Sequence, residues 1–76
     1  MKTPLYICRT KENVSLDALA VKCGSSASTL NRLELGRSKN PSGSVCLKLI
    51  TRYKKYGLTL NHLVNPLDYP DFVIKD

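Results

Sequence analysis

The sequence has little of the chemistry on which most enzymes depend. Its 76 residues include one histidine, three cysteines, one phenylalanine and no tryptophan. It has no glycine-rich phosphate loop, and no histidine stands in the context of a serine and an acid that a catalytic triad needs. A chain this short buries only about 60% of its unfolded surface, which leaves little room for a deep pocket. We therefore expect no enzymatic activity, no cofactor and no small-molecule substrate.

Long apolar runs are missing as well. No stretch approaches the ~18 residues of a membrane helix, and the Met1–Pro4 segment has neither the apolar core nor the cleavage site of a secretion signal. Cys8, Cys23 and Cys46 are odd in number and widely spaced, which fits neither a disulfide framework nor, with the single His62, a zinc site. These absences predict a cytoplasmic protein with reduced thiols, no metal and no membrane partner.

Acidic residues are scarce. Six Asp and Glu stand against twelve Lys and Arg, which gives a formal net charge of +6 and an isoelectric point of about 9.5. All but one of the basic residues lie within residues 1–65, whereas half of the acidic ones lie within residues 66–76. A basic body favours a polyanionic partner such as nucleic acid, and a mildly acidic tail is expected to face away from it.

Capping residues and apolar spacing predict five short helices and hardly a strand. The helices are expected at about 4–12, 16–22, 27–35, from an N-cap at Ser42 or Ser44 to 56, and 60–65. Thr3, Ser15, Ser26 and Thr59 are the expected N-caps. Asn13, Gly24, Gly36 and Gly57 are expected to end helices, Asn13 in the left-handed conformation and Gly24 with a positive φ. A β-prone run at residues 71–75 is too short to stand alone. The predicted fold class is all-α.

Apolar side chains at helical spacing define the expected core. These residues are Leu5, Cys8, Val14, Leu19, Ala20, Cys23, Leu30, Leu33, Val45, Leu49, Ile50 and Tyr53. Arg9 and Lys11 are expected to face water, and His62 to lie on the surface or at an edge of the core. The segment 36–43, rich in glycine, serine and asparagine, is the longest expected loop.

Residues 15–36 are the most informative stretch. Two helices of about two turns each are joined at Gly24, which supplies a positive φ without steric cost, and Ala20 is small enough to let the two helices cross closely. The second helix presents small polar groups outward, while Leu30 and Leu33 anchor it to the core. This arrangement lets a helix enter the DNA major groove and predicts a helix-turn-helix.

The chain resembles the phage Cro/repressor group of helix-turn-helix proteins, also called the XRE family, over about residues 5–65. The resemblance rests on Ser15, Leu19-Ala20, Gly24, Ser26, Leu30, Leu33-Glu34, Gly36, Asn40-Pro41 and Gly57-Leu58-Thr59. It implies a compact five-helix, lambda-repressor-like domain at residues 1–66 and a short extended tail at residues 67–76. Leu16 departs from the family, which often has a glutamine there that contacts the DNA backbone.

The resemblance also implies which residues meet double-stranded DNA. Base contacts are expected from Ala27, Ser28, Thr29, Asn31 and Arg32, and phosphate contacts from Ser15, Ser26, Arg37, Ser38, Lys39 and Asn40. Arg32 is the only long donor on that face, and both base reading and a phosphate or carboxylate partner remain open for it. The family pattern places Glu34 toward the protein, paired with Arg9.

The expected function is a sequence-specific transcriptional regulator, a Cro-like repressor that binds its operator as a homodimer. A single helix-turn-helix monomer buries little surface, so two half-sites are expected. Tyr69, Phe72, Val73 and Ile74 are expected to help form the dimer, because residues 72–74 have no obvious place in the helical core; packing back on their own subunit is the alternative. An antitoxin that binds its toxin, or a restriction–modification controller protein, are the alternative functions.

Overall fold

The computed structural model describes residues 2–38 and 41–75, and within them the chain is all-helical, as the sequence predicts. The elements are α1 (Pro4–Lys11), α2 (Leu16–Cys23), α3 (Ala27–Glu34), α4 (Gly43–Tyr53), the 3-10 helix η1 (Lys54–Tyr56), α5 (Leu60–Val64) and the 3-10 helix η2 (Pro66–Asp68). None of these helices is long and apolar enough to cross a bilayer.

The helix expected to run to Tyr56 ends earlier. α4 stops at Tyr53, and the chain tightens into η1 before Gly57 turns it. Ser42 is the N-cap residue of α4, but its hydroxyl lies 3.1 Å from that of Ser44 and makes no hydrogen bond to the helix backbone. Ser42 is therefore the N-cap residue, as predicted, but its side chain does not cap the helix.

One type of ending closes four of the helices. Asn13, Gly24, Gly36 and Gly57 have φ angles of 56°, 66°, 77° and 88°, respectively. After α2, the Ser25 N–H donates to Ala20 O at 2.9 Å and the Gly24 N–H to Val21 O at 3.2 Å, which is the paired bonding of a Schellman motif. All four residues end helices as the sequence predicts, and the positive φ expected at Asn13 and Gly24 is confirmed.

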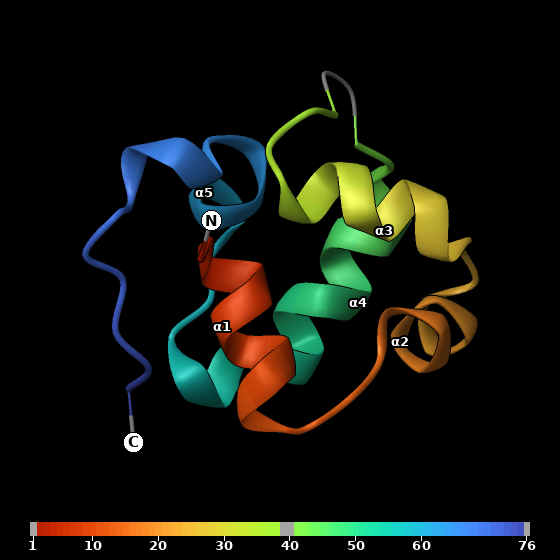
Figure 1. The fold of residues 1–76 in the computed structure, drawn as a ribbon, viewed down its shortest axis with the longest axis horizontal. Coiled ribbons are helices and arrows are strands. Elements are labelled where there is room, and N and C mark those ends of the chain that lie inside the picture. Colours follow the sequence, from red (N-terminus) through yellow and green to blue (C-terminus); the bar gives the residue numbers. More distant parts are fainter. Residues whose placement is uncertain (1, 39–40, 76) are drawn as a thin grey trace.

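The helices surround one core. α2 packs on α3, α1 contacts α3 and α5, and α4 contacts α2 and α5; Figure 1 shows α1 and α2 below α3. The buried apolar residues are Leu5, Cys8, Leu19, Ala20, Cys23, Leu30, Leu33, Val45, Cys46, Leu49, Tyr53, Leu58 and Leu63. Val14 and Ile50 pack against them only partly buried, so the expected core is largely confirmed.

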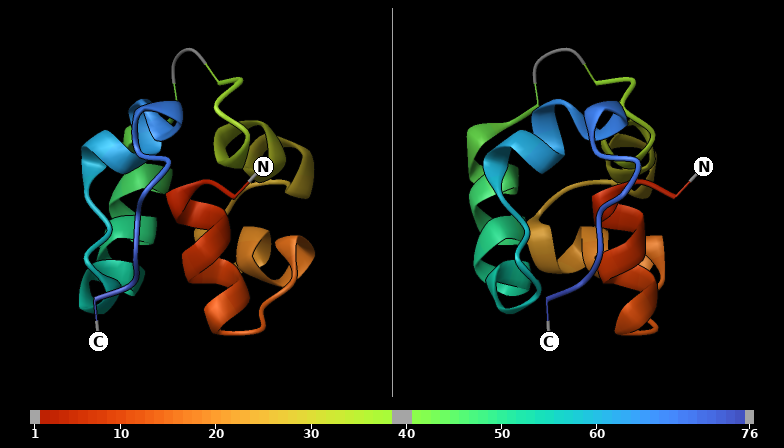
Figure 2. Two further views of the ribbon diagram at one scale, coloured as in Figure 1. Left: turned by 60° about the vertical axis from the view of Figure 1, so that its left-hand side comes forward. Right: turned by 90° about the vertical axis from the view of Figure 1, so that its left-hand side faces the viewer.

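The tail folds back on its own subunit. His62 of α5 makes edge-to-face contacts with Tyr69 and Phe72, at ring-centroid distances of 4.5 and 4.8 Å. The Lys75 N–H donates to Tyr56 O at 3.0 Å, so the chain returns along α5 to the end of η1, as the blue segment in Figure 2 shows. The expectation that Phe72 has no place in the core is wrong, because the partner that covers it lies ten residues earlier in the chain.

Candidate nucleic-acid interface

Side-chain caps fix the starts of α2 and α3, the helix pair that carries the candidate site. The Ser15 hydroxyl accepts a hydrogen bond from the Ala18 N–H at 3.1 Å, and the Ser26 hydroxyl accepts one from the Thr29 N–H at 3.2 Å. Each cap satisfies one of the donors that a helix start leaves free. Both helices of the pair therefore begin where the sequence predicts.

The outer face of α3 is polar and open to solvent. Leu30 and Leu33 are buried beneath it. Of the residues predicted to contact bases, Ser28, Thr29, Asn31 and Arg32 are exposed and Ala27 is partly buried. The four exposed side chains offer hydroxyl, amide and guanidinium groups, which are the groups that read base edges in the major groove. The structure thus brings all five predicted base contacts together on one short helix.

The first turn of α3 holds two hydroxyls in mutual contact. Besides accepting from the backbone, Ser26 Oγ donates its hydrogen to Thr29 Oγ1 at 2.9 Å. The Ser26 hydrogen is therefore already used, whereas the hydrogen on the exposed Thr29 hydroxyl has no acceptor within residues 2–38 and 41–75. Of the two hydroxyls, Thr29 is the one free to donate to DNA, and the phosphate contact expected of Ser26 requires this pair to rearrange.

Arg32 is free of carboxylate partners in the described part of the chain. The ion pairs there join Arg9 to Glu34 and both Arg52 and Lys55 to Glu12. The alternative in which a neighbouring acid neutralises Arg32 therefore has no support from the geometry. Its guanidinium is exposed to solvent in the C-terminal part of α3. A guanidinium can donate hydrogen bonds both to a base edge and to a phosphate.

An ion pair holds the end of α3 against α1. Arg9 Nε donates to Glu34 Oε2 at 2.8 Å and Arg9 Nη2 to Glu34 Oε1 at 3.1 Å, so the contact is bidentate. The two side chains are only 13% and 5% exposed. The hydrogen bond to Glu34 raises the pKa of Arg9. Pairing of Arg9 with Glu34 is confirmed, and the expectation that Arg9 faces water is wrong.

The same contact removes an acid from the exposed surface of α3. Glu34 is 4% exposed, and its backbone carbonyl accepts a hydrogen bond from the Thr3 hydroxyl. A carboxylate on α3 would otherwise repel phosphate. Because α1 covers Glu34, no acidic side chain is exposed on α3.

A family model described as helix-turn-helix matches residues 5–60, which is most of the chain. The chain belongs to the Cro/repressor-type, or XRE, helix-turn-helix family. It is accordingly a DNA-binding transcriptional regulator. No curated protein and no solved structure gives a significant match to the chain.

The loop after α3 carries the remaining phosphate contacts expected in this XRE-family protein. Its first residue past Gly36 is Arg37, whose side chain is exposed and whose N–H donates to Arg32 O at 2.8 Å. Ser38 is half-buried. Lys39 and Asn40, which were also predicted to contact phosphate, lie outside the described residues. The backbone hydrogen bond from Arg37 to Arg32 thus fixes Arg37 just after the C-terminal end of α3, the helix predicted to read bases.

Tertiary packing brings to the α2–α3 turn a lysine that no sequence pattern predicts there. Lys48 is exposed on α4, and its Nζ lies 3.4 Å from the position that a Cβ on Gly24 would take. The ammonium therefore lies at the C-terminal end of α2, next to the turn. Its positive charge interacts favourably there with the negative end of the helix dipole. The two residues are 24 positions apart, so no local pattern signals their contact.

Other basic residues of this family member serve the fold. Glu12, at the end of α1, accepts from Arg52 at 3.1 Å and pairs with Lys55 at 2.9 Å. Burial alone would raise the pKa of Glu12, but the hydrogen bond from Lys55 and the charges of Arg52 and Lys55 outweigh it and lower that pKa. These two cations tie α4 and η1 to α1 and are thereby committed within the protein.

No metal or redox site is visible in the described part of this helix-turn-helix protein. No group of three or more His, Cys, Asp or Glu side chains is placed to hold a metal ion within residues 2–38 and 41–75. The three thiols are free and buried, and burial raises the pKa of each; for Cys8 it reaches about 12, with a contribution from the Glu12 charge. Thiols so protonated are poor nucleophiles.

Proposed function

We propose that the protein is a Cro-like repressor that acts in the cytoplasm or nucleoid of a bacterial cell and binds a specific operator as a homodimer. The observation that carries this proposal is the outer face of α3, where exposed polar side chains from Ser28 to Arg32 surround a helix anchored by Leu30 and Leu33. The two halves of a palindromic operator would each receive one α3 helix.

Two kinds of contact are proposed: base contacts on α3 itself, and phosphate contacts from residues outside it. Thr29, Asn31 and Arg32 have the donors and acceptors needed to read base edges, and Ala27 can pack against a thymine methyl group. Arg37 and the capped N-terminus of α2 at Ser15 would contact phosphates, because helix starts and exposed cations attract them. The base contacts supply sequence preference and the phosphate contacts supply most of the affinity.

The test is selection of bound duplexes from a random DNA pool, followed by titration of the enriched sequence and of an unrelated duplex. We expect a palindrome to be enriched and bound with strong salt dependence. Arg32→Ala should lose ~1–3 kcal/mol on the enriched sequence and relax the preference at one base pair. Equal losses on both duplexes would instead make Arg32 a phosphate ligand.

Arg37→Ala is the matched phosphate variant. It should weaken binding to every sequence and lower the salt slope by about one. Lys75→Ala removes the same charge from an exposed residue of the tail and should change neither quantity. If no duplex shows salt-sensitive binding, the proposal of an operator-binding repressor is wrong.

A further inference from the structure

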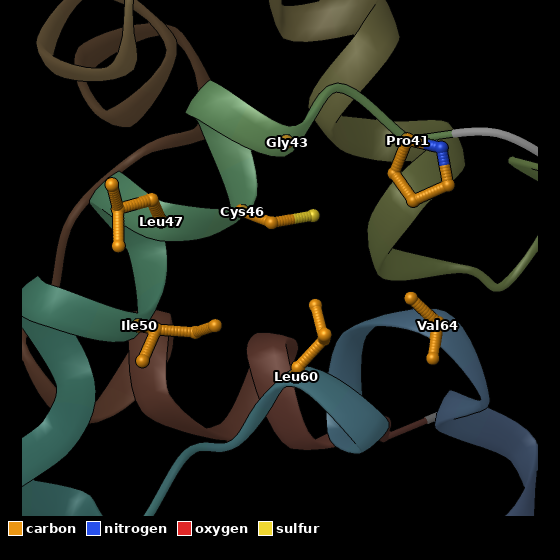
Figure 3. Close-up of a pocket in the computed structure, with 7 residues that line it drawn as sticks. All are labelled: Pro41, Gly43, Cys46, Leu47, Ile50, Leu60 and Val64. Atoms are coloured by element: carbon orange, nitrogen blue, oxygen red, sulfur yellow. The ribbon is translucent and has the colours of Figure 1, made fainter.

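Hydrogen-bonding side chains gather on α3 rather than in the hollow between α4 and α5. The hollow has a volume of about 520 Å³, and Figure 3 shows the residues that line it. None of these residues has a charged, hydroxyl or amide side chain. Ligand recognition that depends on placed donors and acceptors has its side-chain groups on the exposed face of α3 instead, at Ser28, Thr29, Asn31 and Arg32.

The hydroxyls at the start of α3 differ in how far they are committed. Ser26 Oγ accepts from the Thr29 N–H at 3.2 Å and donates to Thr29 Oγ1 at 2.9 Å. One lone pair of Thr29 Oγ1 is thereby occupied, while the hydrogen of the Thr29 hydroxyl is left for another acceptor. The neighbouring Ser28 hydroxyl makes no hydrogen bond within residues 2–38 and 41–75, so it can turn either to donate or to accept. Thr29 is thus held in one orientation and Ser28 is not.

Thr10 of α1 shows how a threonine hydroxyl is otherwise used inside a helix of this protein. It donates to the carbonyl oxygens of Tyr6 and Ile7, at 2.9 and 3.2 Å. Thr29 is the third residue of α3, so the carbonyls three and four residues before it belong to Ser26 and Ser25, which precede the helix. Among the residues that the structure describes, the Thr29 hydroxyl donates to no carbonyl. The hydrogen that Thr10 gives to its own helix is therefore available on Thr29 for a ligand.

We propose that Ser26 fixes the Thr29 hydroxyl as a hydrogen-bond donor toward DNA, so that Thr29 selects a base with a major-groove acceptor and disfavours cytosine. Guanine, adenine and thymine each present an acceptor in that groove, whereas cytosine presents only its N4 amino donor. Thr29 is then a specificity-determining residue, and Ser26 is the residue that positions it. This inference rests on the proposed operator-binding function, because it names what one residue of α3 reads there.

The place of Thr29 in the helix favours a base over a phosphate as its partner. The N-terminal residues of a helix that enters the major groove are the ones that reach base edges, and Thr29 lies in the first turn of α3. That turn also carries the positive end of the helix dipole, which favours an electronegative acceptor over the amino group of cytosine. No acidic side chain is exposed on α3 to reverse this preference.

A cytosine opposite Thr29 would bring two donors together. The second lone pair of Thr29 Oγ1 could accept from the cytosine amino group, but the hydroxyl hydrogen would then lie in a desolvated contact without an acceptor. A hydrogen-bonding group left without a partner costs more than an average hydrogen bond contributes. We therefore expect binding to weaken about threefold to tenfold when the base that Thr29 contacts is changed to cytosine.

The test replaces Ser26 with two residues that cap a helix as well as serine does. In Ser26→Asn the side-chain amide keeps both an acceptor for the Thr29 N–H and a donor for the Thr29 hydroxyl. In Ser26→Asp the carboxylate has acceptors only, so the Thr29 hydroxyl turns its hydrogen toward the cap and presents lone pairs to DNA. The two variants have nearly the same shape and differ in the direction of this one hydrogen bond.

Two further variants complete the set. Thr29→Val removes the hydroxyl and keeps the branched shape of the side chain, so it identifies the base pair that the hydroxyl contacts. Ser26→Gly removes the partner of Thr29 and is tolerated at an N-cap, which keeps the test decisive if Ser26→Asp does not fold. Circular dichroism of each full-length variant reports whether the helices are retained.

Base preference is the quantity to measure, because a change in stability alone does not alter it at one position. Each protein is used to select duplexes from a random pool, and the enriched sequence is titrated with each of the four bases at the position where Thr29→Val loses its preference. The wild type and Ser26→Asn should bind cytosine there about threefold to tenfold more weakly than the best base. In Ser26→Gly this factor should fall below about twofold, because the freed hydroxyl can turn to accept.

Ser26→Asp should change the order of the bases. Its added negative charge weakens binding to every duplex alike, so the comparison is made among the four bases within this variant. Cytosine and adenine, which present amino donors in the major groove, should gain relative to guanine and thymine. A structural effect of the substitution would lower all four affinities and leave their order unchanged.

Three results would overturn the inference and leave the operator-binding repressor standing. They are a wild type that prefers cytosine at the Thr29 position, a Thr29→Val variant whose preferences match those of the wild type at every position, and a Ser26→Asp variant that keeps the wild-type order of bases. A uniform loss of affinity in Thr29→Val belongs to the second result and would make Thr29 a phosphate ligand. If the wild type binds no duplex, the proposed function is wrong and the base-reading role of Thr29 is wrong with it.

Discussion

The guanidinium of Arg9 donates two hydrogen bonds, of 2.8 and 3.1 Å, to the carboxylate of Glu34, which lies 25 residues later in the sequence. The pair joins the last turn of α1 to the last residue of α3. A third hydrogen bond, from Arg9 Nη1 to Val14 O at 2.9 Å, holds the α1–α2 connection as well. One side chain thus links α1, the α1–α2 connection and the end of α3, in addition to the buried contacts of Leu30 and Leu33.

Removal of that side chain should destabilise the fold. Arg9→Ala leaves Glu34 buried without its counter-ion, and we expect a loss of about 3 kcal/mol in the free energy of unfolding, measured by urea denaturation. Arg52→Ala, which breaks a more exposed pair with Glu12, should cost about 1 kcal/mol or less. Equal costs for the two variants would show that burial does not govern these pairs.

Tyr53, in contrast to Arg9 and Glu34, is a buried polar residue without a partner in the described part of the chain. Its side chain is fully buried, and its hydroxyl has no hydrogen-bond partner among the described residues. A buried hydroxyl without a partner costs free energy, so Tyr53→Phe should leave stability unchanged or raise it by up to about 1 kcal/mol. Leu49→Ala in the same core should lose ~2–5 kcal/mol. A clear loss of stability in Tyr53→Phe would mean that the hydroxyl is bonded in solution.

Asp17 is an exposed acid in the first turn of α2, close to the predicted phosphate contact at Ser15. Asp17→Asn should strengthen binding to every duplex by about two- to fivefold at low salt, because a repulsive charge is removed, and the gain should fade as salt is added. Asp71→Asn, in the tail, removes the same charge and should change little. A gain that is equal in both variants would reflect net charge alone.

His62 should make stability depend on pH. The Thr59 N–H donates to His62 Nδ1 at 2.9 Å, a bond that only the neutral ring can accept at that atom, and burial lowers the pKa of His62 below its ordinary 6.5. The unfolded chain therefore takes up this proton first. The contribution of His62 to stability is complete above pH 6.5 and is lost as the pH falls toward the lowered pKa.

The measurement is the urea midpoint at about pH 7 and about pH 5, a window that stays above the ordinary pKa of glutamate. The midpoint of the wild type should fall over this range, and that of His62→Gln, which cannot titrate, should stay nearly level. A wild-type midpoint that rises toward pH 5 would contradict the assigned direction.

The sequence was sufficient for the elements whose signals are local. Capping serines, glycines at helix ends and the spacing of Leu30 and Leu33 predicted the helix pair and the exposed face of α3. It was insufficient where partners are distant. Phe72 meets His62 only after the tail reverses, and Lys48 meets Gly24 only after α4 packs on α2. The spacing of residues such as Leu60 cannot distinguish a core position from an exposed one.

The paired hydroxyls of Ser26 and Thr29 bear on how α3 would engage a ligand. Both side chains are held before any DNA arrives, one by its cap and the other by its neighbour. Rotamers already restricted in the free protein add little to the entropic cost of association. The first turn of α3 is therefore preorganised, and we expect the entropy lost on binding to come mainly from longer side chains such as Arg32 and Arg37.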